Sequence, residues 1–313
     1  MTVFVAAFPG FSLPVDFNRD KRPTVSLVLG SGGARGLAHI GVIQWLTENG
    51  FEIRSIAGSS MGALVGGIYA AGRLEDYTRW VSVLERSDVI RLLDFSFSSS
   101  GLLKGERIIN ELRKLIGDYR IEDLPVAFTA VATDVADGKE VRFSHGSLFD
   151  AIRASIAIPT VFTPHSYKGK RYFDGSLVSP MPLAVTSQDK TDLTVAVNVA
   201  ALPEPGLKPL SEPARSKQKN SAGYRRLLIR FLNSINNKKK NAKEPELGFV
   251  DVITRSTEIM QNTITQFQLE NDPPDIVIDV PRNVCSFYEF YRARELIEIG
   301  RSKAEDAFAA QKV

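Results

Sequence analysis

The sequence is almost without cysteine. Its 313 residues include a single cysteine, Cys285, and three histidines. One thiol can form neither an intramolecular disulfide nor a cysteine-based metal site, so both are excluded. Because chains without disulfides are typical of reducing compartments, we expect a cytoplasmic protein.

Long apolar runs are also missing. No stretch approaches the ~18 consecutive apolar residues that indicate a membrane-spanning helix. Residues 1–23 begin with a short apolar run, but no basic residues precede it and Pro9 and Pro14 interrupt it. We therefore expect residues 1–23 to be an N-terminal extension rather than a secretory signal.

The chain as a whole has little excess charge of either sign. Lys and Arg number 39 and Asp and Glu number 36, so the net charge is +3, which gives no indication of nucleic-acid binding. The charge is nevertheless segregated. Residues 208–243 contain eleven Lys or Arg and one acid, Glu212, so this segment carries +10 and the rest of the chain −7.

Apolar side chains recur at helical spacing inside this basic segment. They are Tyr224, Leu227, Leu228, Phe231, Leu232 and Ile235. A basic amphipathic helix over 224–240 would associate peripherally with an anionic membrane. The alternative is a helix that covers the protein's own core between basic linkers. In both cases we expect residues 205–247 to form a basic, partly flexible insertion.

Short apolar runs alternate with helical patterns along the rest of the chain. Strands are predicted at 24–30, 53–58, 126–135, 139–144, 193–200 and 276–281. Helices are predicted at 37–50, 61–72, 105–116, 147–157, 250–270 and 287–310. This alternation predicts an α/β fold, a three-layer α/β/α sandwich whose mainly parallel central sheet is covered on both faces.

Ser60 is the first candidate for chemistry, because Gly58 and Gly62 place it at the centre of a G-x-S-x-G motif. An apolar strand precedes the motif and a helix follows it, which is the context of a nucleophile elbow. The glycines allow the strand and helix backbones to approach closely. The alternative is a small residue in a tight turn or at a helix N-cap.

The glycine-rich turn "GSGGARG", residues 30–36, also joins a strand to a helix. A phosphate-binding P-loop would need Lys and then Ser or Thr after the last glycine, but Leu37 and Ala38 follow. A dinucleotide fingerprint would need an acid near the end of the second strand, and "SIAGSS" has none. An oxyanion hole is the interpretation that pairs with a serine elbow, and a purely structural turn is the alternative.

The base for such a serine is not settled by the residues alone. His39 lies in an apolar helix, where a packed, hydrogen-bonded ring is expected, and His145 and His165 lie in loop-like stretches where exposed side chains are expected. No histidine follows residue 165. Asp174, after a strand-like stretch and before Gly175, is a second candidate, and an ordinary Asp-Gly turn explains the same pair.

Together and in this order, the glycine-rich loop, the G-x-S-x-G serine and the Asp-Gly motif resemble the patatin-like phospholipase family. The chain is most similar to the bacterial RssA-like subgroup, which is related to the catalytic domain of neuropathy target esterase. The supporting stretches are "GLLKGERI" (101–108), "AIRASIAIPTVFTP" (151–164), "STEIMQ" (256–261) and "NDPPDIVI" (271–278). The chain departs from the family pattern at Ser31 and Ser176, where small residues are kept.

The resemblance implies one catalytic domain over 24–313, a Ser60–Asp174 dyad without histidine, and an acyl-enzyme intermediate. It implies that the oxyanion is held by the N–H groups of Gly32, Gly33, Ala34 and Met61. The motifs are completed by Gly30, Arg35, Gly36, Gly58, Gly62 and Gly175. For Arg35 we expect either an anchor to backbone carbonyls or contact with a lipid phosphate.

The implied substrate is a phospholipid or lysophospholipid, and no metal or other cofactor is required. Three alternatives remain: a carboxylesterase, thioesterase or acyltransferase with the same dyad; a non-catalytic lipid-binding regulatory protein; and, disfavoured by the missing acid, a nucleotide-binding oxidoreductase. Nothing in the sequence indicates the oligomeric state.

Overall fold

The computed structural model describes residues 22–94, 101–206 and 249–311. Only residues 22 and 23 of the expected N-terminal extension (1–23) lie in the described part, and only residues 205 and 206 of the expected basic insertion (205–247). The amphipathic stretch 224–240 lies outside it.

One sheet of eight strands forms the centre of the molecule. Its order is β10-β9-β1-β2-β4-β8-β7, with β5 paired to β4. The parallel strands are β1 (Thr24–Leu29), β2 (Glu52–Ser59), β4 (Ala127–Asp134), β9 (Leu193–Ala201) and β10 (Ile276–Pro281). The antiparallel strands are β5 (Glu140–Phe143), β7 (His165–Tyr167) and β8 (Lys170–Asp174). The prediction of a mainly parallel sheet is confirmed, with antiparallel strands gathered at one edge.

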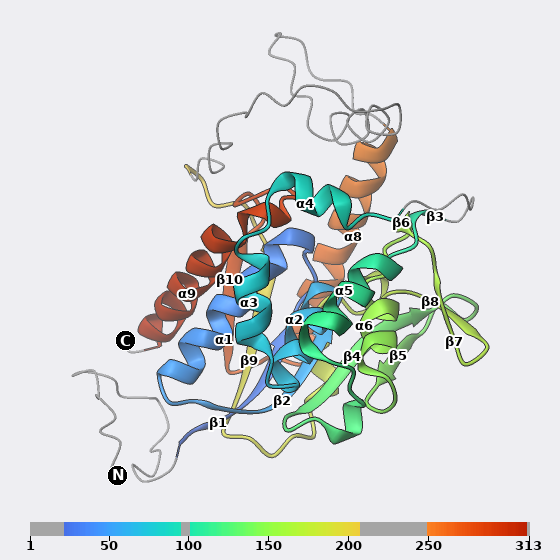
Figure 1. Ribbon diagram of the computed structural model, residues 1–313. Helices are drawn as coiled ribbons and strands as arrows, with labels where there is room; N and C mark the ends of the chain where they lie inside the picture. The colour runs from blue at the N-terminus through green and yellow to red at the C-terminus, as the bar shows by residue number, and fades with distance from the viewer. Residues whose placement is uncertain (1–21, 95–100, 207–248, 312–313) are drawn as a thin grey trace.

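The sheet is covered unequally on its two faces (Figure 1). Most helices pack on one face around a large apolar core. They are α1 (Ala38–Glu48), α2 (Met61–Ala70), α3 (Leu74–Val81), α5 (Glu106–Ile116), α6 (Leu148–Ser155) and α9 (Ala293–Ala310). A smaller core that includes Met181 and Leu183 fills the other face, and Leu269 of α8 (Phe249–Asn271) packs against it. The expected three layers are therefore present.

Apolar composition explains the central strands, since all six residues of β1 are buried, as a strand covered on both faces requires. Several short elements were not predicted, because they lack a long periodic pattern. They are α3, α4 (Arg86–Arg91), and the two-stranded sheet of β3 (Gly101–Leu103) with β6 (Thr160–Phe162). None of the helices in the described ranges is both long and apolar enough to cross a membrane.

Candidate active site

Ser60 lies in the turn between β2 and α2, at the carboxyl end of a parallel strand. Its backbone has φ 54° and ψ −120°, a conformation that a non-glycine residue rarely adopts. The flanking glycine at position 62 is required by close approach, because a Cβ there would overlap the carbonyl of Leu29. The sequence therefore builds a sharp strand-to-helix turn that projects the Ser60 side chain beyond the carboxyl end of β2.

The backbone of Ser60 is held by a residue that sequence reasoning missed. Its N–H donates to Oγ of Ser155 at 2.9 Å, and the Ser155 hydroxyl donates to the carbonyl of Val131 at 2.6 Å. Ser155 is the last residue of α6 and is fully buried. The geometry of the turn is thus held by a helix that comes much later in the chain.

Ser60 and Asp174 meet although 114 residues separate them in sequence. The Ser60 hydroxyl donates to Oδ2 of Asp174 at 2.6 Å. The other carboxylate oxygen accepts the N–H of Ser176 at 2.8 Å. Thr133 donates its hydroxyl to the Asp174 carbonyl at 2.8 Å, which fixes the end of β8 beside β4. The carboxylate is therefore held in one orientation and aimed at the serine.

Burial changes the acidity of this carboxylate. Asp174 has no exposed surface, and desolvation raises its pKa from 3.8 to about 6, while hydrogen bonds from Ser176 and Ser60 oppose the shift. A carboxylate with this pKa is ionised at neutral pH and is a better proton acceptor than an ordinary aspartate. The pair can therefore transfer a proton from hydroxyl to carboxylate.

The glycine-rich loop places N–H groups beside the serine. The N–H groups of Gly30 and Ser31 are used in structural bonds to Val197 and Pro180. Within the described ranges, the N–H groups of Gly32, Gly33 and Met61 donate to no protein acceptor. They remain available to an anion at the start of α2, where the helix dipole favours negative charge.

Ala34 differs from what the sequence predicted. Its N–H donates to the carbonyl of Phe287 at 2.9 Å, so it is not available to an oxyanion. The same contact explains the glycine at position 33, which has φ 58° and whose added Cβ would lie 2.7 Å from the Phe287 carbonyl. Phe287 therefore fixes the loop from the other end of the chain.

Arg35 and His39 support this loop from inside the protein. The Arg35 guanidinium donates to the carbonyls of Gly32 at 3.1 Å and Arg282 at 3.2 Å and pairs with Glu258 at 3.1 Å. The expectation of a loop anchor is confirmed, and contact of this buried side chain with a lipid phosphate is not supported. His39 is buried, burial lowers its pKa to about 4, and its Nε2–H donates to the Gly30 carbonyl at 2.8 Å.

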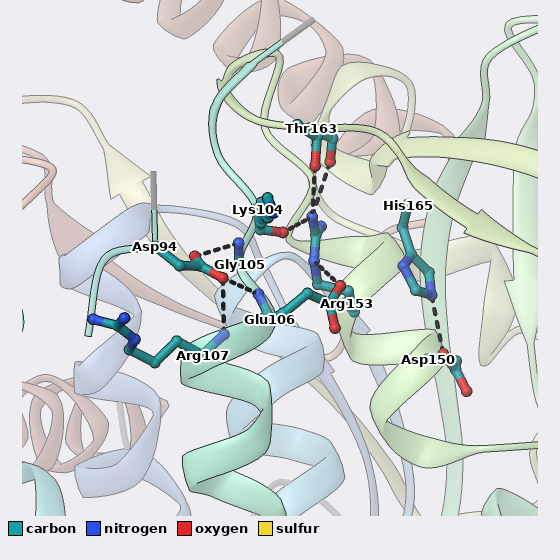
Figure 2. Close-up of polar contacts among 9 residues, drawn as sticks. All are labelled: Asp94, Lys104, Gly105, Glu106, Arg107, Asp150, Arg153, Thr163 and His165. Atoms are coloured by element: carbon teal, nitrogen blue, oxygen red, sulfur yellow. Dashed lines mark hydrogen bonds and ion pairs between the residues drawn. The ribbon is translucent and has the colours of Figure 1, made fainter. Parts of the chain in front are cut away.

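The other two histidines do not reach the serine. His145 contacts the hydroxyl of Ser144, and Nε2 of His165 contacts Oδ1 of Asp150 at 3.1 Å (Figure 2). His165 was expected to be exposed in a loop, but it lies in β7 with a side chain only 12% exposed. In the ranges that the structure covers, no imidazole is hydrogen-bonded to Ser60.

Two cavities share Ser60 in their walls. The larger, of about 200 Å³, is almost entirely apolar and includes Leu64, Trp80, Leu112 and Phe162. The smaller, of about 60 Å³, is more polar and includes Ser31, Ser176, Glu258 and Gln261. Ser60 therefore stands where an apolar space and a polar space meet. Sequence reasoning found neither cavity, because their walls combine segments that lie far apart in the chain.

A buried cation ties together one wall of the larger cavity. Arg153, 2% exposed, donates to the carbonyls of Lys104 and, at 3.0 Å, Thr163 (Figure 2). Its guanidinium also covers the Phe162 ring at 5.6 Å. These bonds join the segment that follows β3 to the segment that follows β6. Residues of both strands line the cavity.

Asp94 binds the start of α5, close to the contacts of Arg153. One carboxylate oxygen accepts the N–H of Gly105 at 2.7 Å, and the other accepts those of Glu106 at 2.8 Å and Arg107 at 3.0 Å (Figure 2). The carboxylate thereby caps the first turn of α5, which carries cavity residues.

The described ranges contain no group of three or more His, Cys, Asp or Glu residues that could hold a metal ion.

Comparison with known proteins identifies a family model and several relatives that this chain matches. The family model described as patatin-like phospholipase matches residues 27–186. An uncharacterized NTE family protein of Mycobacterium tuberculosis is 38% identical over 338 residues, covering 92% of each chain. Lysophospholipase NTE1 of Candida glabrata is 31% identical over 186 residues, which are 57% of this chain and 10% of that protein. The crystal structure of VipD from Legionella pneumophila covers 93% of this chain and 67% of its own, with a TM-score of 0.43 and 14% identity.

Proposed function

The chain belongs to the patatin-like phospholipase family, and we propose that it hydrolyses acyl esters of phospholipids or lysophospholipids through Ser60 and Asp174. Membership of this family supports a lipid hydrolase function. The observation that carries the proposal is the 2.6 Å hydrogen bond from the Ser60 hydroxyl to the Asp174 carboxylate. The position of Ser60 between an apolar and a polar cavity supports a substrate with a fatty chain and a polar alcohol.

The first half of the reaction forms an acyl-enzyme. Asp174 accepts the hydroxyl proton while Ser60 Oγ attacks the ester carbonyl carbon. The carbonyl oxygen becomes an oxyanion, which accepts hydrogen bonds from the N–H groups of Gly32, Gly33 and Met61. The tetrahedral intermediate collapses, the alcohol leaves with the proton from Asp174, and the acyl group remains on Ser60.

The second half releases the fatty acid. A water molecule attacks the acyl-Ser60 carbonyl, and Asp174 accepts its proton. Collapse of the second tetrahedral intermediate breaks the bond to Ser60 Oγ, which regains the proton from Asp174. The chain's own groups supply each proton transfer, so the mechanism needs no further titratable residue.

The two cavities suggest how the substrate is oriented. The fatty chain lies in the larger cavity, because its walls offer aliphatic and aromatic side chains over nearly their whole surface. The alcohol and its head group lie on the side of the smaller cavity. The name of the Candida glabrata relative, lysophospholipase, favours a single-chain lipid as the first substrate to test.

A substrate panel tests the proposal. Purified protein is assayed on lysophospholipid, diacyl phospholipid, a water-soluble ester and acyl-CoA, with Ser60→Ala and Asp174→Asn as variants. We expect lipid ester hydrolysis that both variants abolish while they remain folded. Preference for the soluble ester or acyl-CoA would favour a general esterase or thioesterase, and full activity in either variant would remove the dyad.

A further inference from the structure

Helix α8 presents large apolar side chains to solvent. Among the described residues, six large hydrophobic side chains are exposed, and four of them belong to α8: Val252, Ile259, Met260 and Phe267. Ile259 is 63% exposed and Phe267 is 60% exposed. Their spacing of seven, one and seven residues places all four on one side of the helix. We call these four residues the α8 face.

The opposite side of α8 is held by polar contacts. Glu258 pairs with Arg35 at 3.1 Å, and Gln261 donates to the hydroxyl of Ser176 at 2.7 Å. Gln268 donates to the Ser179 hydroxyl at 2.9 Å and accepts the N–H of Met181 at 3.0 Å. A water-facing helix normally buries its apolar side and exposes its polar side, so the arrangement on α8 is partly reversed.

The α8 face lies on the same helix that borders the reaction site. Ile253, Thr257, Glu258 and Gln261 line the smaller cavity, whose wall also includes Ser60. Through Arg35 and Ser176, the helix is tied to the glycine-rich loop and to the residue that binds Asp174. Whatever covers the α8 face is therefore bound to the helix that lines the smaller cavity beside Ser60.

We propose that the α8 face docks the protein on a lipid bilayer, so that substrate passes from the membrane into the cavity beside Ser60. The inference rests on the proposed lipid substrate, which resides in bilayers, and on two features of the chain. Exposed aliphatic and aromatic side chains insert into the boundary between head groups and acyl chains. The exposed Arg255 lies on the same helix, and the segment 208–243 with its charge of +10 precedes it in sequence, which suits anionic lipid.

Vesicle binding tests the docking surface directly. The Ser60→Ala protein, which leaves the lipid intact, is sedimented with vesicles of phosphatidylcholine, with and without phosphatidylglycerol, at low and high salt. The test variant adds Ile259→Gln and Phe267→Gln. The matched control adds Thr263→Gln, which changes an exposed residue that is already polar and lies between them on the helix. Circular dichroism checks that each variant is folded.

We expect the double substitution to weaken vesicle binding by about tenfold or more, because two large apolar side chains no longer enter the bilayer. The loss should persist at high salt and on neutral vesicles, and the Thr263→Gln control should bind like the parent. Equal binding by the double variant would overturn the proposal. So would a dimer that the double variant converts to a monomer in light scattering, because the face would then be a subunit interface.

The docking surface and the proposed reaction fail in different ways. When Ser60 is kept, the protein with Ile259→Gln and Phe267→Gln should hydrolyse a water-soluble ester at the parent rate and vesicle lipid more slowly. If the soluble ester is cleaved but the double substitution leaves vesicle hydrolysis unchanged, docking is wrong and the reaction stands. If Ser60 is inert toward every ester while vesicle binding still depends on Ile259 and Phe267, the reaction is wrong and docking stands.

Discussion

Ser155 accepts a hydrogen bond from the backbone N–H of Ser60 at 2.9 Å, and its hydroxyl donates a hydrogen bond to the carbonyl of Val131. This link holds the Ser60 backbone at a positive φ that it would otherwise leave. Because the link joins α6 and β4 to the elbow, the position of the Ser60 hydroxyl depends on parts of the chain that carry no catalytic motif.

The first prediction concerns this link. Ser155→Ala leaves the Ser60 N–H buried without an acceptor, so we expect kcat to fall by about tenfold or more with little change in KM. The free energy of unfolding should fall by about 1–3 kcal/mol, the cost of one unsatisfied buried donor. Steady-state kinetics and chemical denaturation measure the two effects.

Ser147→Ala is the matched control for Ser155→Ala. Ser147 caps the start of the same helix by accepting the N–H of Asp150 at 3.2 Å. Losing this cap should cost about 1 kcal/mol of stability while leaving kcat unchanged. Equal losses of kcat in the two variants would mean that Ser155 acts only through general stability.

The second prediction concerns the pH dependence of activity. Burial raises the pKa of Asp174 to about 6, and only the ionised carboxylate accepts the Ser60 proton. We therefore expect kcat/KM for a neutral ester to fall as the pH drops below about 6. A pH profile on a soluble ester measures this, and a limb near the ordinary aspartate value of 3.8 would contradict the assignment.

The third prediction concerns the effect of the same pKa shift on the free energy of unfolding. The folded pKa of Asp174 lies above the unfolded one, so the carboxyl favours the folded state below about pH 4 and this contribution is lost as the pH rises through 6. Replacing the carboxylate with a neutral amide, Asp174→Asn, should raise the free energy of unfolding at pH 8 by about 1–3 kcal/mol. The gain should vanish near pH 4, and a pH-independent difference between the two proteins would exclude the linkage.

The fourth prediction concerns the glycine-rich loop. Gly33→Ala introduces a Cβ at φ 58° that would lie 2.7 Å from the Phe287 carbonyl, so the loop must shift and its N–H groups must move. We expect kcat to fall by about a hundredfold, as when one oxyanion donor is lost.

Gly138→Ala serves as the control for the loop variant. Gly138 has a similar φ of 62°, but no heavy atom lies within 4 Å of an added Cβ. This substitution should cost about 1–2 kcal/mol of stability from backbone strain and leave the rate unchanged. If both glycine variants retain full activity, the position of the loop does not matter for the reaction.

The fifth prediction concerns the larger cavity. Leu112 is fully buried in α5 and forms part of the cavity wall. Leu112→Phe should reduce kcat/KM for long acyl chains more than for short ones, because the added ring fills space that the chain needs. Leu112→Met keeps the volume and should keep the preference. A series of esters of increasing chain length measures the ratio, which would stay constant if the acyl chain binds elsewhere.

The strand-turn-helix around Ser60 could be predicted because its signal is local. An apolar run, a glycine-serine-glycine motif and a small-residue helix follow one another within a few residues, and the structure places β2, Ser60 and α2 there. The pairing of Ser60 with Asp174 could not be derived from the residues, since His145 and His165 were open alternatives as the base, and it was implied only by the family resemblance.

Long-range contacts account for what the sequence did not reveal. The occupied N–H of Ala34 depends on Phe287, and the acceptor for the Ser60 N–H depends on Ser155. The cavity walls come partly from α3 and α4, short elements whose apolar residues follow no extended period. Tertiary packing, not local propensity, decides where such residues lie.

Covalent labelling shows whether Ser60 is a nucleophile that Asp174 activates. The protein is treated with a fluorophosphonate, and the modified residue is mapped by peptide mass spectrometry in the parent, in Ser60→Ala and in Asp174→Asn. We expect a single adduct on Ser60 that is absent from Ser60→Ala and forms far more slowly in Asp174→Asn. An adduct on another serine, or labelling of Ser60 at the parent rate in Asp174→Asn, would contradict it.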